Sequence, residues 1–163
     1  MQACALRRIS NFKTAHRLPT DTRQLLASPF TPKMNHPHVT HPRLPDTPVS
    51  TLPFSPAVVV GDLIFVSGQA SVDLHGKIVS DTFEGEFRRS VENVRRVLVA
   101  AGSDLAHVVQ TRNYVRDAAD LPLFNQLYRE YFSAPFPART TITNCLPPSL
   151  RFEIEVVAVR RTP

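Results

Sequence analysis

Several residue types are scarce in this chain of 163 residues, which has two cysteines, five glycines and no tryptophan. The two cysteines, Cys4 and Cys145, exclude a disulfide-stapled scaffold, and the sequence contains no CxxC or Cys/His spacing typical of a zinc site. No apolar run approaches the roughly 20 residues of a membrane-spanning helix, so no membrane partner is expected. What remains is a chain with 42% hydrophobic and 20% charged residues, which is typical of a globular domain with its own core.

Proline, in contrast, is frequent, and its distribution divides the chain in two. Eight of the 15 prolines and none of the five glycines lie in residues 1–53, which hold seven basic and two acidic groups and a net charge of +5. Residues 54–163 hold twelve groups of each sign and are neutral. A basic, proline-rich segment without apolar periodicity buries too little surface to offset its ordering entropy. We therefore predict a disordered extension over residues 1–53 and one domain over residues 54–163.

The extension permits two interpretations, which the sequence leaves open. Its first 30 residues contain one acidic group beside several arginines and hydroxyl side chains, a composition typical of organellar transit peptides. If residues 1–33 act in this way, the protein is mitochondrial; if Met34 is the true start, or if the extension has no targeting role, it is cytoplasmic. His36, His38 and His41 could bind a metal adventitiously, but we predict a solvated segment and no metal site.

Apolar periodicity and turn residues predict the elements of the domain. Runs rich in β-branched and aromatic residues indicate strands, whereas apolar residues three and four positions apart indicate helices. The order is β-β-(β)-α-β-α-β-β, which favours an α+β domain with one sheet and both helices packed on one face. The predicted strands are 57–60, 63–70, a short 77–79, 108–115, 140–146 and 152–160, and the predicted helices lie between 81 and 102 and between 120 and 135.

Capping residues predict the helix boundaries. Asp81, with Glu84 three positions later, forms a capping-box pattern, and Gly102 suits the left-handed position that ends a helix. Asp120 can cap the second helix, with Pro122 in its first turn, where a missing N–H costs little. The expected apolar faces are Phe83, Phe87, Val91, Val94 and Leu98 on the first helix, and Phe124, Leu127, Tyr128 and Tyr131 on the second.

With both helices on one face, the other face of the sheet has to be solvated or covered by another chain. Residues of the last strand, FEIEVVAV, alternate between an apolar face and a mixed face. Two apolar residues on the mixed face indicate that it is partly buried, so we predict self-association. The apolar face is Phe152, Ile154, Val156 and Ala158, and the mixed face is Glu153, Glu155, Val157 and Val159.

Five segments of the domain carry a recognisable pattern: PFSPAVVVGDLIFVSGQ (53–69), VLVAAGSDLAHVV (97–109), FNQLYREYF (124–132), PARTT (137–141) and FEIEVVAV (152–159). Together, and in this order, they resemble the RidA/YjgF family, also called the endoribonuclease L-PSP family. This resemblance implies a chorismate-mutase-like α+β fold with a single mixed sheet, and a homotrimer with clefts between subunits. It also implies hydrolysis of reactive 2-imino and 2-enamino acids, such as imines derived from 2-aminoacrylate, to 2-keto acids and ammonia, with no metal or organic cofactor.

The resemblance implies two catalytic residues. Arg139 matches the arginine of the family's PAR[ST] motif, and a guanidinium offers a planar fork that binds a carboxylate bidentately. Without the motif, Arg139 would be a surface arginine after a turn. Glu153 matches the first glutamate of the family's E-I-E-x-x-A strand, and a carboxylate there can move protons between water and the departing amine. Glu155 lies on the same face of the strand and is the alternative assignment.

Five further positions are implied to bind substrate. Gly68, at a strand end, lets a ligand approach the backbone and offers its N–H; a bulge or turn glycine is the alternative. Asn125 and Tyr128 match positions of the family's second helix that line the cleft, or else they serve packing alone. Phe54 stands where many members have tyrosine, and Thr141 where many have cysteine, so both positions bear on the choice of substrate.

Four functions are compatible with these residues. The preferred one is an enamine/imine deaminase. The alternatives are a pathway enzyme acting on a related imine, enamine or carbamate-like substrate, a non-catalytic trimer that binds a small ligand, and an RNA-cleaving or RNA-binding protein. The neutral domain, without interleaved aromatic and basic residues, argues against sequence-specific RNA recognition, although the basic extension could bind nucleic acid non-specifically. Cys145, in a predicted strand, is expected to be a buried, inert thiol.

Overall fold

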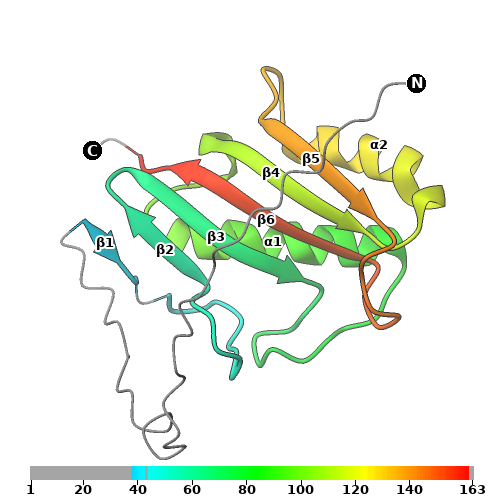
Figure 1. The fold of residues 1–163 in the computed structure, drawn as a ribbon, viewed down its shortest axis with the longest axis horizontal. Coiled ribbons are helices and arrows are strands. Elements are labelled where there is room, and N and C mark those ends of the chain that lie inside the picture. The colour runs from blue at the N-terminus through cyan, green and yellow to red at the C-terminus, as the bar shows by residue number, and fades with distance from the viewer. Residues whose placement is uncertain (1–37, 43, 162–163) are drawn as a thin grey trace, which may run out of the picture. The chain divides into compact units, whose positions relative to one another are not determined.

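The computed structural model describes residues 38–42 and 44–161 of the chain (Figure 1). Within these residues it forms one six-stranded sheet, in the order β1-β2-β3-β6-β4-β5, and two α-helices. Neither of these helices is long and apolar enough to cross a membrane. The strands are Val39–Thr40 (β1), Ala57–Val60 (β2), Leu63–Ala70 (β3), Val108–Val115 (β4), Ala138–Thr143 (β5) and Phe152–Val159 (β6); the α-helices are Phe83–Ala100 (α1) and Leu121–Tyr131 (α2), with short 3-10 helices at Leu105–His107 (η2) and Ala118–Asp120 (η3).

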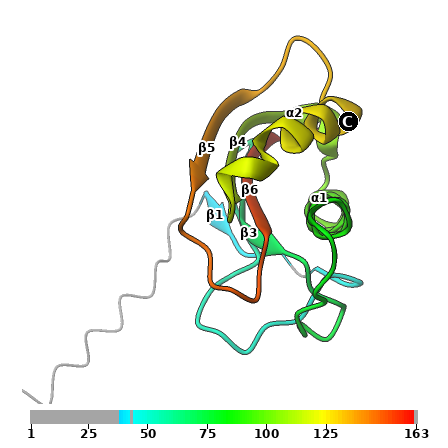
Figure 2. The same cartoon turned by 90° about the vertical axis from the view of Figure 1, so that its right-hand side faces the viewer.

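The sheet is mixed. Neighbouring strands are antiparallel except β4 and β5, which run parallel because α2 carries the chain back between them. Both helices lie on the same side of the sheet (Figure 2). The last strand, β6, lies inside the sheet between β3 and β4. These features confirm the predicted α+β class, with one sheet and both helices on one face.

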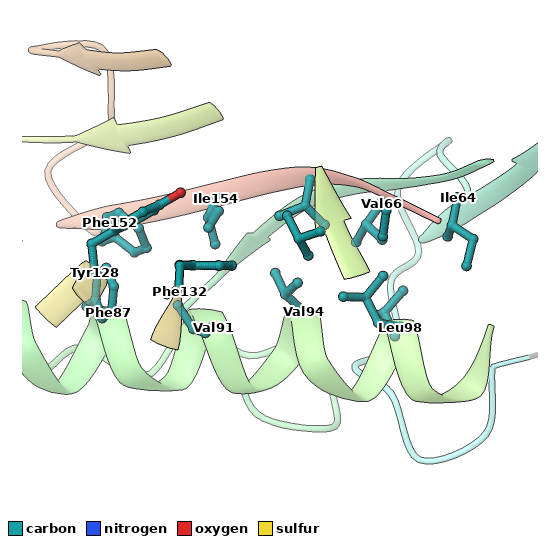
Figure 3. Close-up of a cluster of buried hydrophobic side chains, with 14 of the residues drawn as sticks. Ile64, Val66, Phe87, Val91, Val94, Leu98, Tyr128, Phe132, Phe152 and Ile154 are labelled. Carbon is teal, nitrogen blue, oxygen red and sulfur yellow. The ribbon is translucent and has the colours of Figure 1, made fainter. Parts of the chain in front are cut away.

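The core lies between the helices and the sheet. Figure 3 shows side chains pointing from α1 toward the strands, where they meet side chains of β3 and β6. The predicted apolar face of α1 is buried at every position, and Tyr131 is the one member of the predicted α2 face that is only partly buried. Burying each large apolar side chain contributes roughly 1.5–3 kcal/mol. The core includes Phe83, Phe87, Val91, Val94 and Leu98 of α1, Phe124, Leu127 and Tyr128 of α2, and Ile64, Val66, Phe152, Ile154, Val156 and Ala158 of the sheet.

The start of α1 lies one residue later than predicted. Thr82 is the N-cap, and its Oγ1 accepts a hydrogen bond from the Gly85 N–H at 3.1 Å. Glu84, the predicted second member of the capping box, forms an exposed ion pair within α1 instead. The Thr82 N–H donates to Asp81 Oδ1 at 2.7 Å, and the buried Glu86 accepts a hydrogen bond from the N–H of Asp81, the residue before the N-cap. The acidic pattern therefore marks the helix start, but the capping residues are different ones.

The short strand predicted over residues 77–79 is reduced to a single bridge between Val72 and Ile78. The Asn93 amide on α1 donates hydrogen bonds to the Ala70 and Val72 carbonyls at 3.1 and 3.0 Å. The intervening Ser71 carbonyl faces the 77–79 segment instead and accepts a hydrogen bond from the Val79 N–H at 2.8 Å, while the Asp73 N–H donates to the Lys77 carbonyl at 2.9 Å.

Three further local predictions need correction. Asp120 holds the N-cap position of α2, but its side chain makes no capping hydrogen bond. The strand predicted over 140–146 ends at Thr143, because Asn144 has a positive φ of 61°, which an extended strand excludes. Cys145 follows this turn and is exposed, not buried as predicted.

The domain begins before the predicted boundary at residue 54. β1 pairs antiparallel with β2, with Val39 opposite Val60. Thr47 is buried, and its Oγ1 donates a hydrogen bond to the Leu44 carbonyl at 2.8 Å, while the Leu44 side chain packs against the core. The division between residues 53 and 54 is therefore corrected. The sequence prediction missed these contacts because backbone pairing and isolated side chains leave no apolar periodicity.

The predictions for the first 37 residues lie outside the described part of the chain. They comprise disorder, a transit peptide over 1–33, a start at Met34 and any metal contact of His36. Of the other two histidines, His41 has its Nδ1 3.1 Å from Ser55 Oγ. Among the described residues, no three His, Cys, Asp or Glu side chains are grouped so that they could hold a metal ion.

The face of the sheet opposite the helices is partly apolar. Phe65 of β3 is 43% exposed and lies in register with Val58 of β2 and Val157 of β6. Toward β4 the same face carries charge, with Arg112 Nη1 2.7 Å from Glu155 Oε1. This combination of apolar and charged side chains is the mixed face that the alternation of the last strand predicts.

Candidate functional site

Arg139, the predicted carboxylate ligand, is the second residue of β5 and lies beside Thr111 of β4. Its guanidinium carbon is 4.9 Å from the ring centre of Tyr128 and 5.2 Å from that of Phe124. Such cation–π contacts attract the guanidinium to the ring faces. Arg139 makes no side-chain hydrogen bond or ion pair with the described residues, so its N–H donors are available to a ligand.

A cavity of about 230 Å³ opens beside this guanidinium. It brings together three of the predicted residues, Asn125 and Tyr128 of α2 and Arg139 of β5. Arg129 and Phe136 also line it, and Arg129 Nη1 donates a hydrogen bond to the Asn125 carbonyl at 3.0 Å. Two guanidinium groups at one small cavity favour an anionic ligand, and a carboxylate matches the fork geometry of arginine.

A second cavity, of about 300 Å³, contains Phe54, Gly68 and Glu153. The Glu153 carboxylate lies so close to Gly68 that a β-carbon at this position would overlap Glu153 Oε1. Gly68 lies where the pairing of β3 with β6 shifts register, between Val66 and Gln69. The bulge and the missing side chain together make room for the carboxylate. Gly68 is therefore a bulge glycine that also lines the cavity of Glu153.

Glu153 has a perturbed carboxyl group. Burial raises its pKa, and the negative charge of Glu155 raises the pKa further. Glu153 makes no side-chain hydrogen bond or ion pair with the described residues, whereas Glu155 is engaged by Arg112 at 2.7 Å. A carboxyl with a raised pKa and no internal partner is suited to exchange protons with a ligand. The geometry therefore favours Glu153 over Glu155 as the proton-transfer group.

The structure does not bring the two predicted catalytic residues together within one chain. Arg139 lies over the rings of α2, on the helix side of the sheet. Glu153 alternates with the buried Phe152 and Ile154 and therefore belongs to the uncovered side. The predicted residues form two groups: the Arg139 half-site is Asn125, Tyr128 and Arg139, and the Glu153 half-site is Phe54, Gly68 and Glu153.

Thr141 lines neither of these two cavities. Its Oγ1 is buried without a hydrogen-bond partner, and so is Oδ1 of Asn113, which lies opposite Thr141 in the register of β4 and β5. Asn113 and Thr111 are buried polar residues beside the Arg139 half-site that the motifs do not identify. The alternation of β4 holds the only signal for them, because both share the inward face of the strand with the apolar Val115.

A protein-family model and several known proteins are similar to most of the domain. The family described as Endoribonuclease L-PSP matches residues 45–160. The human 2-iminobutanoate/2-iminopropanoate deaminase is 37% identical over 110 residues, which are 66% of this chain and 80% of the human protein. The protein of the same name from Salmonella typhimurium is 33% identical over 120 residues, 71% of this chain and 94% of that protein. A RutC family protein from Saccharolobus solfataricus is 41% identical over 108 residues, 65% of this chain and 86% of that protein.

Solved structures share the fold as well. The YjgF gene product from E. coli is 32% identical, with a TM-score of 0.66, and the match covers 75% of this chain and 98% of the E. coli chain. RidA from an Antarctic Psychrobacter species is 26% identical, with a TM-score of 0.68, and the match covers 74% and 98% of the two chains. With the family matched over most of its length, and with its motifs on the expected elements, the chain belongs to the RidA/YjgF family, also called the endoribonuclease L-PSP family.

Proposed function

We propose that the protein hydrolyses 2-imino and 2-enamino acids to 2-keto acids and ammonia. The observation that carries this proposal is the Arg139 guanidinium, which has no ionic partner among the described residues and borders a cavity of about 230 Å³. Its two parallel N–H groups fit the carboxylate that these substrates and their products share. Relatives named 2-iminobutanoate/2-iminopropanoate deaminase, at 32 to 37% identity, support the same chemistry.

In this reaction Arg139 holds the substrate carboxylate and thereby fixes the position of the imine carbon. Water adds to this carbon, and Glu153 accepts a proton from the water and returns one to the nitrogen. The resulting carbinolamine gives up its hydroxyl proton as its nitrogen gains one, and the C–N bond breaks to release ammonia and leave the 2-keto acid. An enamine substrate first gains a proton on carbon and loses one from nitrogen, which converts it to the imine. The reaction consumes one water molecule and changes no oxidation state, so the two side chains supply only binding and proton transfer.

We place the complete site between two copies of the chain. The Arg139 half-site and the Glu153 half-site lie on different sides of the same sheet, so Arg139 of one copy has to meet Glu153 of a neighbour. The exposed Phe65 and its paired residues give the uncovered face apolar surface for association. Such a contact joins two different surfaces, which closes into a ring when the rotation between copies allows it, and the family resemblance implies a ring of three copies.

A related substrate is the second candidate, and the wall of the Glu153 cavity favours it. Phe54 contributes a ring without a hydroxyl group, and Leu52 and Ile78 add further apolar side chains. Such a wall suits an imine, enamine or carbamate-like compound with a larger apolar substituent. RNA cleavage, which the family description suggests, has less support, because residues 54–163 carry no net charge.

The test is the rate of 2-keto acid release from imines that an amino-acid oxidase generates in the assay. We expect the wild-type protein to accelerate release and Arg139→Ala to abolish the acceleration. Arg95→Ala removes a guanidinium from the exposed face of α1, where it pairs with Glu92, and should leave the rate unchanged. If the wild-type protein accelerates nothing yet binds 2-oxobutanoate through Arg139, a non-catalytic ligand-binding protein replaces the deaminase.

A further inference from the structure

A closed ring of contacts joins Arg139 to buried polar side chains of β4. Tyr128, whose ring contacts the guanidinium, has its hydroxyl 3.0 Å from Thr111 Oγ1. The Asn113 Nδ2 donates hydrogen bonds to Thr111 Oγ1 at 3.0 Å and to the Thr140 carbonyl at 3.1 Å. Thr140 is the residue that follows Arg139, so the ring of contacts returns to its starting point.

These polar groups occupy a place where apolar side chains would pack. Thr111 and Asn113 are 0% exposed, and Tyr128 is 3% exposed. Burying hydroxyl and amide groups is unfavourable unless they are hydrogen-bonded, and apolar side chains of the same shape would fill the space without that requirement. The network is also local to the edge strand β5, which has a single neighbour, β4, to hold it in place. A role tied to β5 therefore explains the network better than packing does.

We infer that Thr111 and Asn113 are positioning residues for Arg139. Thr111 fixes the rotation of the Tyr128 ring through its hydroxyl, and the face of this ring sets the plane of the guanidinium. Asn113 fixes the backbone of β5 next to Arg139, because its Nδ2 donates a hydrogen bond to the Thr140 carbonyl.

The plane of the guanidinium decides whether two of its N–H groups reach a carboxylate at the same time. A free guanidinium would sample many planes, and ordering it on binding would weaken the complex. The ring of contacts imposes this order before the ligand arrives. The inference rests on the proposed function in one respect, which is that the ligand of Arg139 is a carboxylate.

Two substitutions at Thr111 distinguish the effect of its hydroxyl from the effect of its shape. Thr111→Val keeps the shape and removes the hydroxyl, while Thr111→Ser keeps the hydroxyl. Thr111→Val loses the contacts of Oγ1 with both Tyr128 and Asn113. We expect it to raise both KM for the imine and Kd for 2-oxobutanoate about tenfold, with a much smaller change in kcat. Thr111→Ser should restore both constants to near their wild-type values. Asn113→Leu, which lacks the amide donors, should act in the same direction as Thr111→Val.

A second measurement is independent of activity. The NMR resonance of the Arg139 Nε–H group, identified by its loss in Arg139→Lys, is sensitive to the two aromatic rings that the guanidinium contacts. Thr111→Val should shift this resonance, and Thr111→Ser should return it. The matched control is Ser103→Ala, which removes another buried hydroxyl, one that donates to the Val159 carbonyl at 2.7 Å. It should lower the thermal midpoint without moving the resonance or KM.

The outcomes distinguish this inference from the proposed function. If Thr111→Val lowers the thermal midpoint but leaves the resonance, KM and Kd at their wild-type values, Thr111 is a packing residue and the inference is overturned. If the wild-type protein has no deaminase activity, the proposed function fails. In that case the shift of the Arg139 resonance, and its return in Thr111→Ser, still decide whether Thr111 positions Arg139.

Discussion

For single residues, the sharpest expectation concerns the shape of Arg139 rather than its charge. Lysine keeps the positive charge but cannot present two parallel N–H groups. We expect Arg139→Lys to lower kcat/KM roughly 10- to 150-fold, which corresponds to about 1.5–3 kcal/mol of transition-state binding. Steady-state release of 2-keto acid measures the loss, with Arg95→Lys as the control that retains the wild-type rate. An equally active Arg139→Lys would contradict the assignment of Arg139 to the carboxylate.

Glu153 should determine turnover rather than binding. Glutamine keeps the size of the side chain but cannot accept a proton, so we expect Glu153→Gln to lower kcat by about 10²- to 10⁴-fold. The Kd for 2-oxobutanoate, measured by calorimetry, should stay near its wild-type value because Arg139 still holds the carboxylate. A large loss of affinity with an unchanged kcat would instead make Glu153 a binding residue.

The pH dependence of the reaction should reflect the environment of Glu153. As a proton acceptor, Glu153 has to be ionised, and burial raises its pKa above the usual value of 4.5. The value of kcat/KM should therefore fall as the pH drops through this raised pKa, at a higher pH than for an ordinary glutamate. The same profile measured for the residual activity of Glu153→Gln should lack this step. A step that persists in Glu153→Gln would belong to another group.

Motif residues could be located from the sequence, but their surroundings could not. Arg139 and Glu153 are identified by short segments whose spacing is local. Thr111 and Asn113 are not, because their partners Tyr128 and Thr140 lie 17 and 27 positions further along the chain. Only the pairing of β4 with β5 and the packing of α2 bring these groups together.

Among the elements, α1 depends on a buried carboxylate at its start. Glu86 Oε2 accepts a hydrogen bond from the Arg151 N–H at 2.6 Å, and its Oε1 accepts one from the Asp81 N–H at 3.2 Å. Glu86→Ala would leave both donors unpaired, which we expect to lower the free energy of unfolding by about 2–4 kcal/mol. Glu84→Ala, in the same turn, removes only an exposed pair with Arg88 and should cost under about 1 kcal/mol. Equal losses in denaturant unfolding would contradict this difference.

Element prediction worked where the signal is periodic and failed where it is not. The spacing of Phe83, Phe87 and Val91 is visible in the sequence because neighbouring turns of a helix repeat it. β1 has two residues and no period, so its pairing with β2 is invisible before the sheet forms. The end of β5 depends on the backbone conformation of Asn144, which asparagine tolerates but does not dictate.

At the scale of the whole molecule, a site shared between copies can be tested by mixing two inactive variants. Arg139→Ala retains Glu153, and Glu153→Ala retains Arg139, so a mixed assembly can unite an intact Arg139 half-site with an intact Glu153 half-site. Random assembly from equal amounts leaves both residues intact at about a quarter of the interfaces. We therefore expect co-expressed or co-refolded variants to regain about a quarter of the wild-type activity.

The control for this experiment is the assembly of each variant alone. Light scattering should give both variants the wild-type mass, which is that of three chains of 18.2 kDa for the proposed trimer. If both assemble and their mixture stays inactive, Arg139 and Glu153 do not act at a shared interface. The division of the two half-sites between the sides of the sheet was not predictable from the motifs, because it depends on how the edge strand β5 is oriented against α2.

The two-residue strand β1 has a consequence for how the chain can be shortened. Without it, β2 would be the outermost strand of the sheet, with the exposed Val60 at its end and a row of backbone groups free to pair with strands of other molecules. A fragment that starts at residue 54 lacks β1 and should aggregate on heating, whereas one that starts at Met34 retains β1 and should stay dispersed. We thus expect the shortest strand of the fold to keep β2 from pairing with other molecules and so to limit aggregation.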